Sequence, residues 1–122
     1  EWAKVHVNYY GIPKSSFDLP IKKGKCPVLV IDVQGAKTVK KIFKNAVSIF
    51  IAPPSLEELE KRIALRNDGT ADIQVRMATA KKELEHIKDY DYLVINDIFK
   101  AAVKDCAAII KAERLKVSRK KI

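Results

Sequence analysis

Three short apolar runs mark the chain at residues 27–33 (PVLVIDV), 46–53 (AVSIFIAP) and 91–97 (DYLVIND). All three are rich in β-branched residues, and their apolar positions do not alternate with polar ones. Such runs are typical of strands that are buried on both faces of a parallel sheet. The pattern therefore predicts three core strands.

Helical patterns lie between and after these runs. We expect helices at residues 35–45, 55–66, 72–88 and 100–114. The second helix starts with the capping box of Ser55 and Glu58. The expected core faces, read from the helical period, are Val39 and Phe43; Leu56, Leu59 and Ile63; Ile73, Met77, Ala80, Leu84 and Ile87; and Val103, Cys106 and Ile110. Alternating strands and helices predict an α/β fold with a parallel sheet and right-handed crossovers.

The 122 residues suit a single domain with three regions. Residues 1–26 have short alternating apolar positions and predict a small β-rich part. Residues 27–114 form the expected α/β core, and the polar link RNDGTAD at residues 66–72 carries a strong turn signal. Residues 115–122 form a basic tail, which is expected to be solvated.

The net charge of +9 favours polyanionic partners such as nucleotides, nucleic acid or acidic lipid. No apolar run approaches the length of a membrane span, so we expect no membrane partner. Cys26 and Cys106 do not form a CxxC motif, and neither lies near a histidine in sequence, so a zinc site is not expected. Two reduced thiols fit a cytoplasmic protein.

Three arginines flank the polar link. Arg62 and Arg66 lie four residues apart and share a helix face, and Arg76 follows in the next helix. Guanidinium groups bind phosphates bidentately and neutralise their charge, so these side chains could close on a transferring phosphoryl group. The alternative is that Glu58 pairs with Arg62 at i,i+4 and that all three arginines are solvated. Spacing alone favours this alternative.

Polar residues also follow two of the expected strands. Asp32 ends the apolar stretch VLVID within the run at residues 27–33, and Asn96 and Asp97 end the run at residues 91–97. Ligands of α/β proteins bind at the carboxyl ends of parallel strands, where Asp32 could hold a metal-bound water or a cationic side chain near phosphates. The alternatives are that Asp32 is an acid at a helix N-terminus and that Asp97 caps the last helix.

The N-terminal segment holds Glu1 and the tyrosine pair Tyr9 and Tyr10. A carboxylate can accept two hydrogen bonds from a guanine edge, and a phenol can donate one to a phosphate oxygen. A tyrosine pair in an edge strand more often serves packing.

Taken together, these stretches resemble guanylate kinase. The resemblance rests on EWAKVHVNYYG (1–11), VLVIDVQGA (28–36), FIAPPSLEELEKRI (50–63) and RMATAKKELEHIKDYDYLVIND (76–97), which occur in the family's order and at matching distances. It implies a three-layer α/β domain like that of the P-loop kinases, with a mobile lid at about residues 62–76. The implied reaction transfers the γ-phosphoryl group of ATP to GMP, with Mg²⁺ as the metal.

The resemblance also implies a role for each matching residue. Glu1 would read the guanine base and Tyr10 would bind the GMP phosphate, whereas Tyr9 would serve packing. Asp32 would lie near the phosphates and magnesium. Asn96 would lie by the adenine of ATP. The lid arginines, which would stabilise the transferring phosphoryl group, are Arg62, Arg66 and Arg76.

Three residue-level departures from the family pattern stand out. Ile12 replaces a usual Thr or Ser whose hydroxyl contacts guanine, and its loss would cost about 0.5–1.5 kcal/mol. Val30 replaces a usual acidic residue and so removes a charge near the phosphates. The lid loop is one residue short.

The larger departure is that nothing in the 122 residues resembles GxxGxGK[ST], the loop that holds ATP and Mg²⁺ in the family. We therefore expect an incomplete α/β fold, the C-terminal three-fifths of the family's length, without its first strand and P-loop. Such a chain alone is expected to be incompetent in catalysis and to self-associate through unpaired sheet edges.

Two other functions compete with the kinase. One is a non-catalytic binding domain of the guanylate-kinase-like type, which the missing P-loop, Ile12 and Val30 favour. The retention of Glu1, Tyr10, Asp32 and the three arginines opposes it, because a scaffold has no use for a phosphate clamp. The other is a nucleic-acid binder, which rests on net charge alone and is the weakest of the three.

Overall fold

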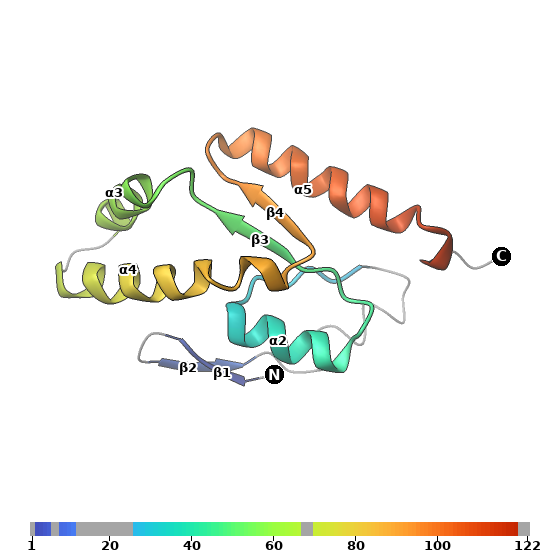
Figure 1. The fold of residues 1–122 in the computed structure, drawn as a ribbon, viewed down its shortest axis with the longest axis horizontal. Coiled ribbons are helices and arrows are strands. Elements are labelled where there is room, and N and C mark those ends of the chain that lie inside the picture. Colours follow the sequence, from blue (N-terminus) through green and yellow to red (C-terminus); the bar gives the residue numbers. More distant parts are fainter. Residues whose placement is uncertain (1, 6–7, 12–25, 67–69, 120–122) are drawn as a thin grey trace. The chain divides into compact units, whose positions relative to one another are not determined.

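The computed structural model describes residues 2–5, 8–11, 26–66 and 70–119 (Figure 1). The chain divides into two compact units, Glu1–Val47 and Ser48–Ile122. Each unit has its own small sheet, antiparallel in the first and parallel in the second. Among the described residues, no helix is long and apolar enough to cross a membrane.

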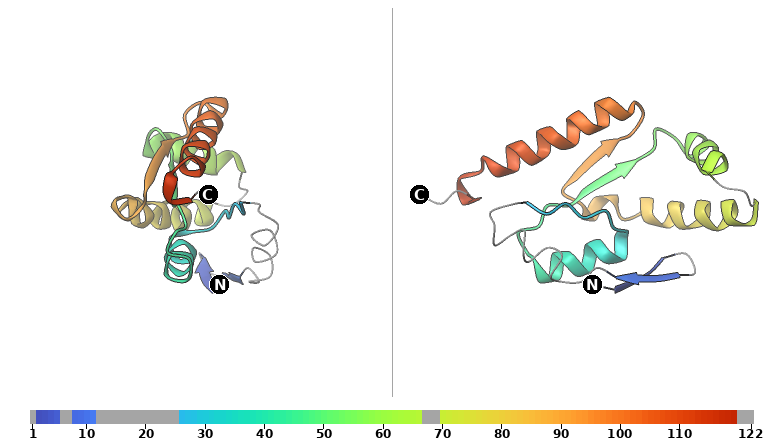
Figure 2. Two further views of the ribbon diagram at one scale, coloured as in Figure 1. Left: turned by 90° about the vertical axis from the view of Figure 1, so that its right-hand side faces the viewer. Right: turned by 180° about the vertical axis from the view of Figure 1, so that it is seen from behind.

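The first unit combines a β-hairpin with one helix. Strands β1 (Trp2–Val5) and β2 (Asn8–Gly11) pair antiparallel, with Trp2 opposite Gly11. Helix α2 (Val33–Ile42) lies against β1 (Figure 2). The hairpin agrees with the β-rich character expected of the N-terminal segment over the eight residues of β1 and β2. It also places the Tyr-Tyr-Gly sequence in strand β2.

Helix α2 begins at Val33 because Asp32 is its N-cap. The Asp32 Oδ1 atom accepts a hydrogen bond from the Gly35 N–H at 2.9 Å, and the Asp32 carbonyl accepts one from Ala36 at 2.9 Å. The first bond satisfies an N–H group of the first turn that has no partner within the helix, and the second is the first regular i→i−4 bond of α2. The helix-terminal role that the sequence offered as an alternative for Asp32 is confirmed.

The strand expected at residues 27–33 is wrong. Residues 26–32 have no regular secondary structure, and Val28 and Val30 are 71% and 94% exposed. A strand of a parallel sheet needs a neighbour for its backbone N–H and C=O groups. Among the described residues of the first unit, the hairpin is the only sheet, and this segment does not join it. The apolar run alone could not supply that neighbour.

The second unit contains the predicted parallel pair. Strand β3 (Ile49–Ala52) pairs with β4 (Tyr92–Ile95), with Ile49 opposite Tyr92. Its helical elements, in chain order, are α3 (Leu56–Arg66), α4 (Thr70–Leu84), the 3₁₀ helix η1 (Ile87–Asp89), α5 (Phe99–Arg114) and the 3₁₀ helix η2 (Val117–Arg119). This order confirms the α/β alternation over residues 48–119 (Figure 1).

The two core strands are not buried on both faces, as their composition predicted. Side chains alternate along each strand: Phe50, Ala52 and Val94 are buried, whereas Ile51, Leu93 and Ile95 are about half exposed. Helix α5 packs on β4, and the Phe50 ring packs edge-on against Tyr90 with centroids 5.0 Å apart. Among the described residues, each strand is thus well covered on one side only. Self-association through the exposed positions stays a prediction.

The predicted core faces of α3 and α4 are largely confirmed. The Ser55 hydroxyl caps α3 by accepting the Glu58 N–H at 3.1 Å. The predicted residues of α4 are half-buried, although α4 ends at Leu84 and Ile87 belongs to η1. Leu56, at the start of α3, is 41% exposed and lies outside the core.

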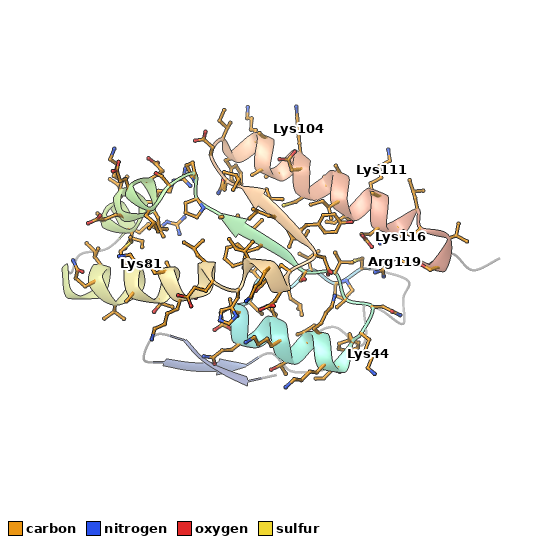
Figure 3. All side chains as sticks on the ribbon, viewed as in Figure 1. Lys44, Lys81, Lys104, Lys111, Lys116 and Arg119 are labelled. Carbon is orange, nitrogen blue, oxygen red and sulfur yellow. The ribbon has the colours of Figure 1, made fainter. Side chains whose placement is uncertain are left out.

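Helix α5 departs from its predicted core face. Val103 is 49% exposed, while Ala102 and the charged Glu113 are buried. Only 6% of Glu113 is exposed, and its carboxylate accepts a hydrogen bond from the Tyr92 hydroxyl at 2.5 Å. It also pairs with Lys116 at 3.0 Å and with Arg119 at 3.4 Å, both labelled in Figure 3. Two cations of the basic tail are therefore folded back onto a buried acid.

These contacts shift two pKa values in opposite directions. The hydrogen bond from Tyr92, followed by the one from Lys116, lowers the pKa of Glu113 below its ordinary value. The same hydrogen bond, followed by burial, raises the pKa of the Tyr92 hydroxyl. Ionised Glu113 and neutral Tyr92 are therefore the forms that join α5 to β4.

Replacing Glu113 by Gln should lower the urea midpoint of unfolding at neutral pH, because Lys116 and Arg119 lose their shared anion. The folded pKa of Glu113 is depressed, so its contribution to stability is present above the ordinary value of 4.5 and is lost as pH falls below it. The gap between wild type and Glu113→Gln should therefore narrow in acid. Unfolding curves at neutral pH and below 4.5 measure this gap.

Glu60→Gln is the matched control, since Glu60 is an exposed glutamate on α3. It should change the midpoint little at either pH. A gap between wild type and Glu113→Gln that stays constant with pH would show that the Glu113 charge does not stabilise the fold.

Candidate functional site

The candidate site lies at the carboxyl ends of β3 and β4. Because the two strands are parallel, both of them end at the same edge of the sheet. β3 is followed by Pro53, Pro54 and then α3, and β4 is followed by Asn96, Asp97 and then α5. Figure 2 shows α3 and the start of α5 at this edge. The sheet thereby brings helix α3 and the loop after β4 together.

Arg62 connects these two parts. Its Nη1 atom donates to the Asn96 carbonyl at 2.7 Å, and its Nη2 atom lies 3.4 Å from the Asp97 carbonyl. Its Nε atom donates to Glu58 Oε1 at 3.2 Å. The side chain is 32% exposed. The predicted Glu58–Arg62 pair is confirmed, but Arg62 is not the solvated arginine of that alternative.

The backbone of Asn96 is held from both sides. Its N–H donates to the Ala52 carbonyl at the end of β3, at 2.8 Å, and its carbonyl accepts from Arg62. Asn96 thus extends the β3–β4 ladder by one bond. Asp97 does not cap α5 as the alternative proposed, because the N-cap is Ile98, which makes no side-chain cap bond.

Arg66 and Arg76 lie on two helices that pack against each other. Arg66 is exposed at the end of α3, and Arg76 is half-buried on α4. Within the described part of the chain, neither arginine has a hydrogen bond or ion pair. The second unit thus contains all three predicted arginines together with Asn96.

The other predicted site residues belong to the first unit. Asp32 belongs to the first unit, where one carboxylate oxygen caps α2. Glu1 and Ile12 lie outside the described residues, as does the side chain of Tyr10, whose backbone belongs to β2 opposite Ala3.

The described residues also bear on the question of a metal site. No group of three or more His, Cys, Asp or Glu side chains gathers there as a metal site. Cys26 and Cys106 are both free thiols. Mg²⁺ that accompanies a nucleotide needs only one or two carboxylates beside phosphates and water. Asp32 is half-buried, and Oδ1 is the only carboxylate oxygen engaged in the α2 cap, so its side chain suits such a metal through water.

Sequence reasoning missed two features of this unit. The Glu58–Arg62 spacing was visible, but nothing in the sequence indicated that Arg62 reaches backbone carbonyls 34 and 35 residues away. One feature of the sequence could have indicated the Tyr92–Glu113 contact. Glu113 lies three residues after Ile110 and therefore on the predicted inner face of α5.

Comparison with known proteins gives a consistent family assignment. The family model for guanylate kinase matches residues 1–113. The guanylate kinase of Clostridioides difficile is 43% identical over 122 residues, which are 99% of this chain and 60% of that protein. The guanylate kinase of Thermotoga maritima is 44% identical over 120 residues, which are 98% of this chain and 58% of that protein.

The structural comparison agrees. A crystal structure of guanylate kinase from Anaplasma phagocytophilum matches with a TM-score of 0.82 and 34% identity, over 98% of this chain and 57% of that one. The expected fold class, an incomplete three-layer α/β domain of the P-loop-kinase type, is thereby confirmed. The chain spans about three-fifths of the length of the relatives that it matches, and it belongs to the guanylate kinase family.

Proposed function

We propose that this chain supplies the GMP-binding segment and the lid of a nucleotide kinase that makes ADP and GDP from ATP and GMP. The observation that carries the proposal is the Arg62 contact, which joins a lid helix to the loop at the carboxyl end of the sheet. Two further arginines on the adjacent helices α3 and α4 add the charge that a phosphate clamp needs.

In the proposed reaction, a phosphate oxygen of GMP attacks the γ-phosphorus of ATP. One P–O bond forms while the bond between the γ-phosphorus and the bridging oxygen breaks, and ADP leaves. The protein forms no covalent bond, so catalysis consists of positioning and of neutralising charge. Mg²⁺, when bound, would neutralise the phosphate oxygens of ATP, and Asp32 is the residue of this chain proposed to hold it through water.

The remaining residues take roles by family resemblance. Glu1 is proposed to read guanine and Tyr10 to bind the GMP phosphate. Asn96 is proposed to lie by adenine. Arg66 and Arg76 are proposed to contact the transferring phosphoryl group. Arg62 is set apart from these two, because three of its five N–H groups already bind Glu58 and the carbonyls of Asn96 and Asp97.

The protein expressed from its full reading frame should convert ATP and GMP to ADP and GDP in a coupled assay. Isothermal titration should also show GMP binding, and Glu1→Gln should weaken that binding because a guanine edge needs an acceptor carboxylate. GMP binding without phosphoryl transfer would instead favour the non-catalytic binding domain. A protein that neither binds GMP nor transfers the phosphoryl group would show that the proposal is wrong.

Arg76→Ala should lower kcat by about a hundredfold to a thousandfold while leaving the KM for GMP nearly unchanged. The reason is that a guanidinium aimed at the transferring phosphoryl group acts mainly in the transition state. Lys81, which is labelled in Figure 3, lies on the same helix as Arg76. The control variant Lys81→Ala removes this cation and should leave kcat unchanged. Equal losses in both variants would indicate a general charge effect.

Asp32→Asn separates the cap from the charge. Asparagine caps helices about as well as aspartate, so the stability of α2 should hold, whereas Asp32→Ala should cost about 1 kcal/mol. The proposed role near magnesium needs the carboxylate, so Asp32→Asn should still lower kcat. Urea unfolding and steady-state kinetics measure the two effects. A wild-type kcat in Asp32→Asn would show that Asp32 caps α2 and has no role near magnesium.

A further inference from the structure

The guanidinium of Arg62 binds protein groups, although the family resemblance implies that it contacts phosphate. Three separate N–H groups point at three acceptors, two of which are backbone carbonyls of successive residues, Asn96 and Asp97. The bond to the Asn96 carbonyl is short at 2.7 Å and partly buried. Hydrogen bonds with a charged donor are about twice as strong as neutral ones. This contact therefore restrains the loop more than an ordinary surface bond would.

The same loop has little other support among the described residues. Its apolar side chains do not hold it, because Ile98 is 67% exposed and Phe99 is 71% exposed. The N-cap of α5 makes no side-chain bond that would tie the loop to the helix. Asn96 has its ladder bond to Ala52, but the chain beyond Asn96 has only the Arg62 contact before α5 begins.

Glu58 completes the arrangement. Its carboxylate receives the Nε atom of Arg62 and fixes the plane of the guanidinium from within α3. Glu58 is itself held at the first turn of α3, where Ser55 caps its N–H. The helix cap thus holds Glu58, Glu58 orients Arg62, and Arg62 holds the loop after β4.

From this geometry we infer that Arg62 is a positioning residue for the base-binding loop, acting on the nucleotide through Asn96 and Asp97. The inference rests on the proposed function, since Asn96 is the residue proposed to lie by adenine. It deepens that function by making selection of the base at the ATP site depend on a lid helix. Base selection is assigned to the Glu58–Arg62 pair, and phosphate neutralisation falls mainly to Arg66 and Arg76.

The test compares ATP with inosine triphosphate, which has the same ribose and triphosphate but lacks the exocyclic amine of adenine. In Arg62→Ala, a misplaced loop should raise the KM for ATP about fivefold to tenfold and leave the KM for inosine triphosphate nearly unchanged. The preference between the two should shrink by the same factor. Glu58→Gln should act in the same direction by roughly twofold, because it loosens Arg62 without removing it.

Glu57→Gln is the matched control, because Glu57 is exposed in the same first turn of α3 as Glu58. It should leave both KM values unchanged. If Arg62→Ala raises the KM values for ATP and inosine triphosphate by equal factors, Arg62 is a phosphate ligand or a stacking partner of any base. That result would overturn the inference.

A measurement without nucleotide separates this inference from the proposed function. In NMR spectra of the ligand-free protein, Arg62→Ala should shift the Asn96 carbonyl and the Asp97 amide and should speed hydrogen exchange in the loop. Unchanged loop signals would overturn the inference even in an active kinase. A wild-type protein that transfers no phosphoryl group would instead end the proposed function, while the loop signals would still decide whether Arg62 fixes the loop.

Discussion

The parallel pairing of β3 with β4 is the constraint on which the second unit depends. The ladder places residues 49–52 opposite residues 92–95 although more than 40 positions separate them along the chain. Three features follow from it: the ladder bond at Asn96, the meeting of α3 with the loop after β4, and the seat of α5 on β4. Because parallel strands end at one edge, a single pairing gathers residues from three segments.

Charged residues hold this unit together at both ends of the strand pair. At the carboxyl end, Arg62 joins a helix to two backbone carbonyls. Near the start of β4, buried Glu113 accepts the Tyr92 hydroxyl and pairs with Lys116 and Arg119. A buried carboxylate is costly unless it is hydrogen-bonded and paired, and this one is both. Lys116 and Arg119 are thus two cations of the basic tail that contribute to the fold.

The exposed apolar positions fit the share of the family that this chain spans. The relatives are longer, and the chain aligns with 57–60% of the lengths of those described. Val28, Val30 and Leu93 are exposed where the sequence pattern indicated a buried sheet. The sequence pattern indicated one larger sheet, whereas the described residues form two small ones.

The sequence by itself determined the family, the helices and the parallel strands β3 and β4, because these depend on local period, caps and β-branched runs. Ser55 at a helix start and the i,i+4 spacing of Glu58 and Arg62 are local signals, and both hold. Only the tertiary structure decided that residues 27–33 form no strand and that Glu113 is buried. It also decided that Arg62 reaches the loop after β4. The physical reason is that sheet partners, burial and backbone acceptors come from residues far away along the chain, which no local pattern specifies.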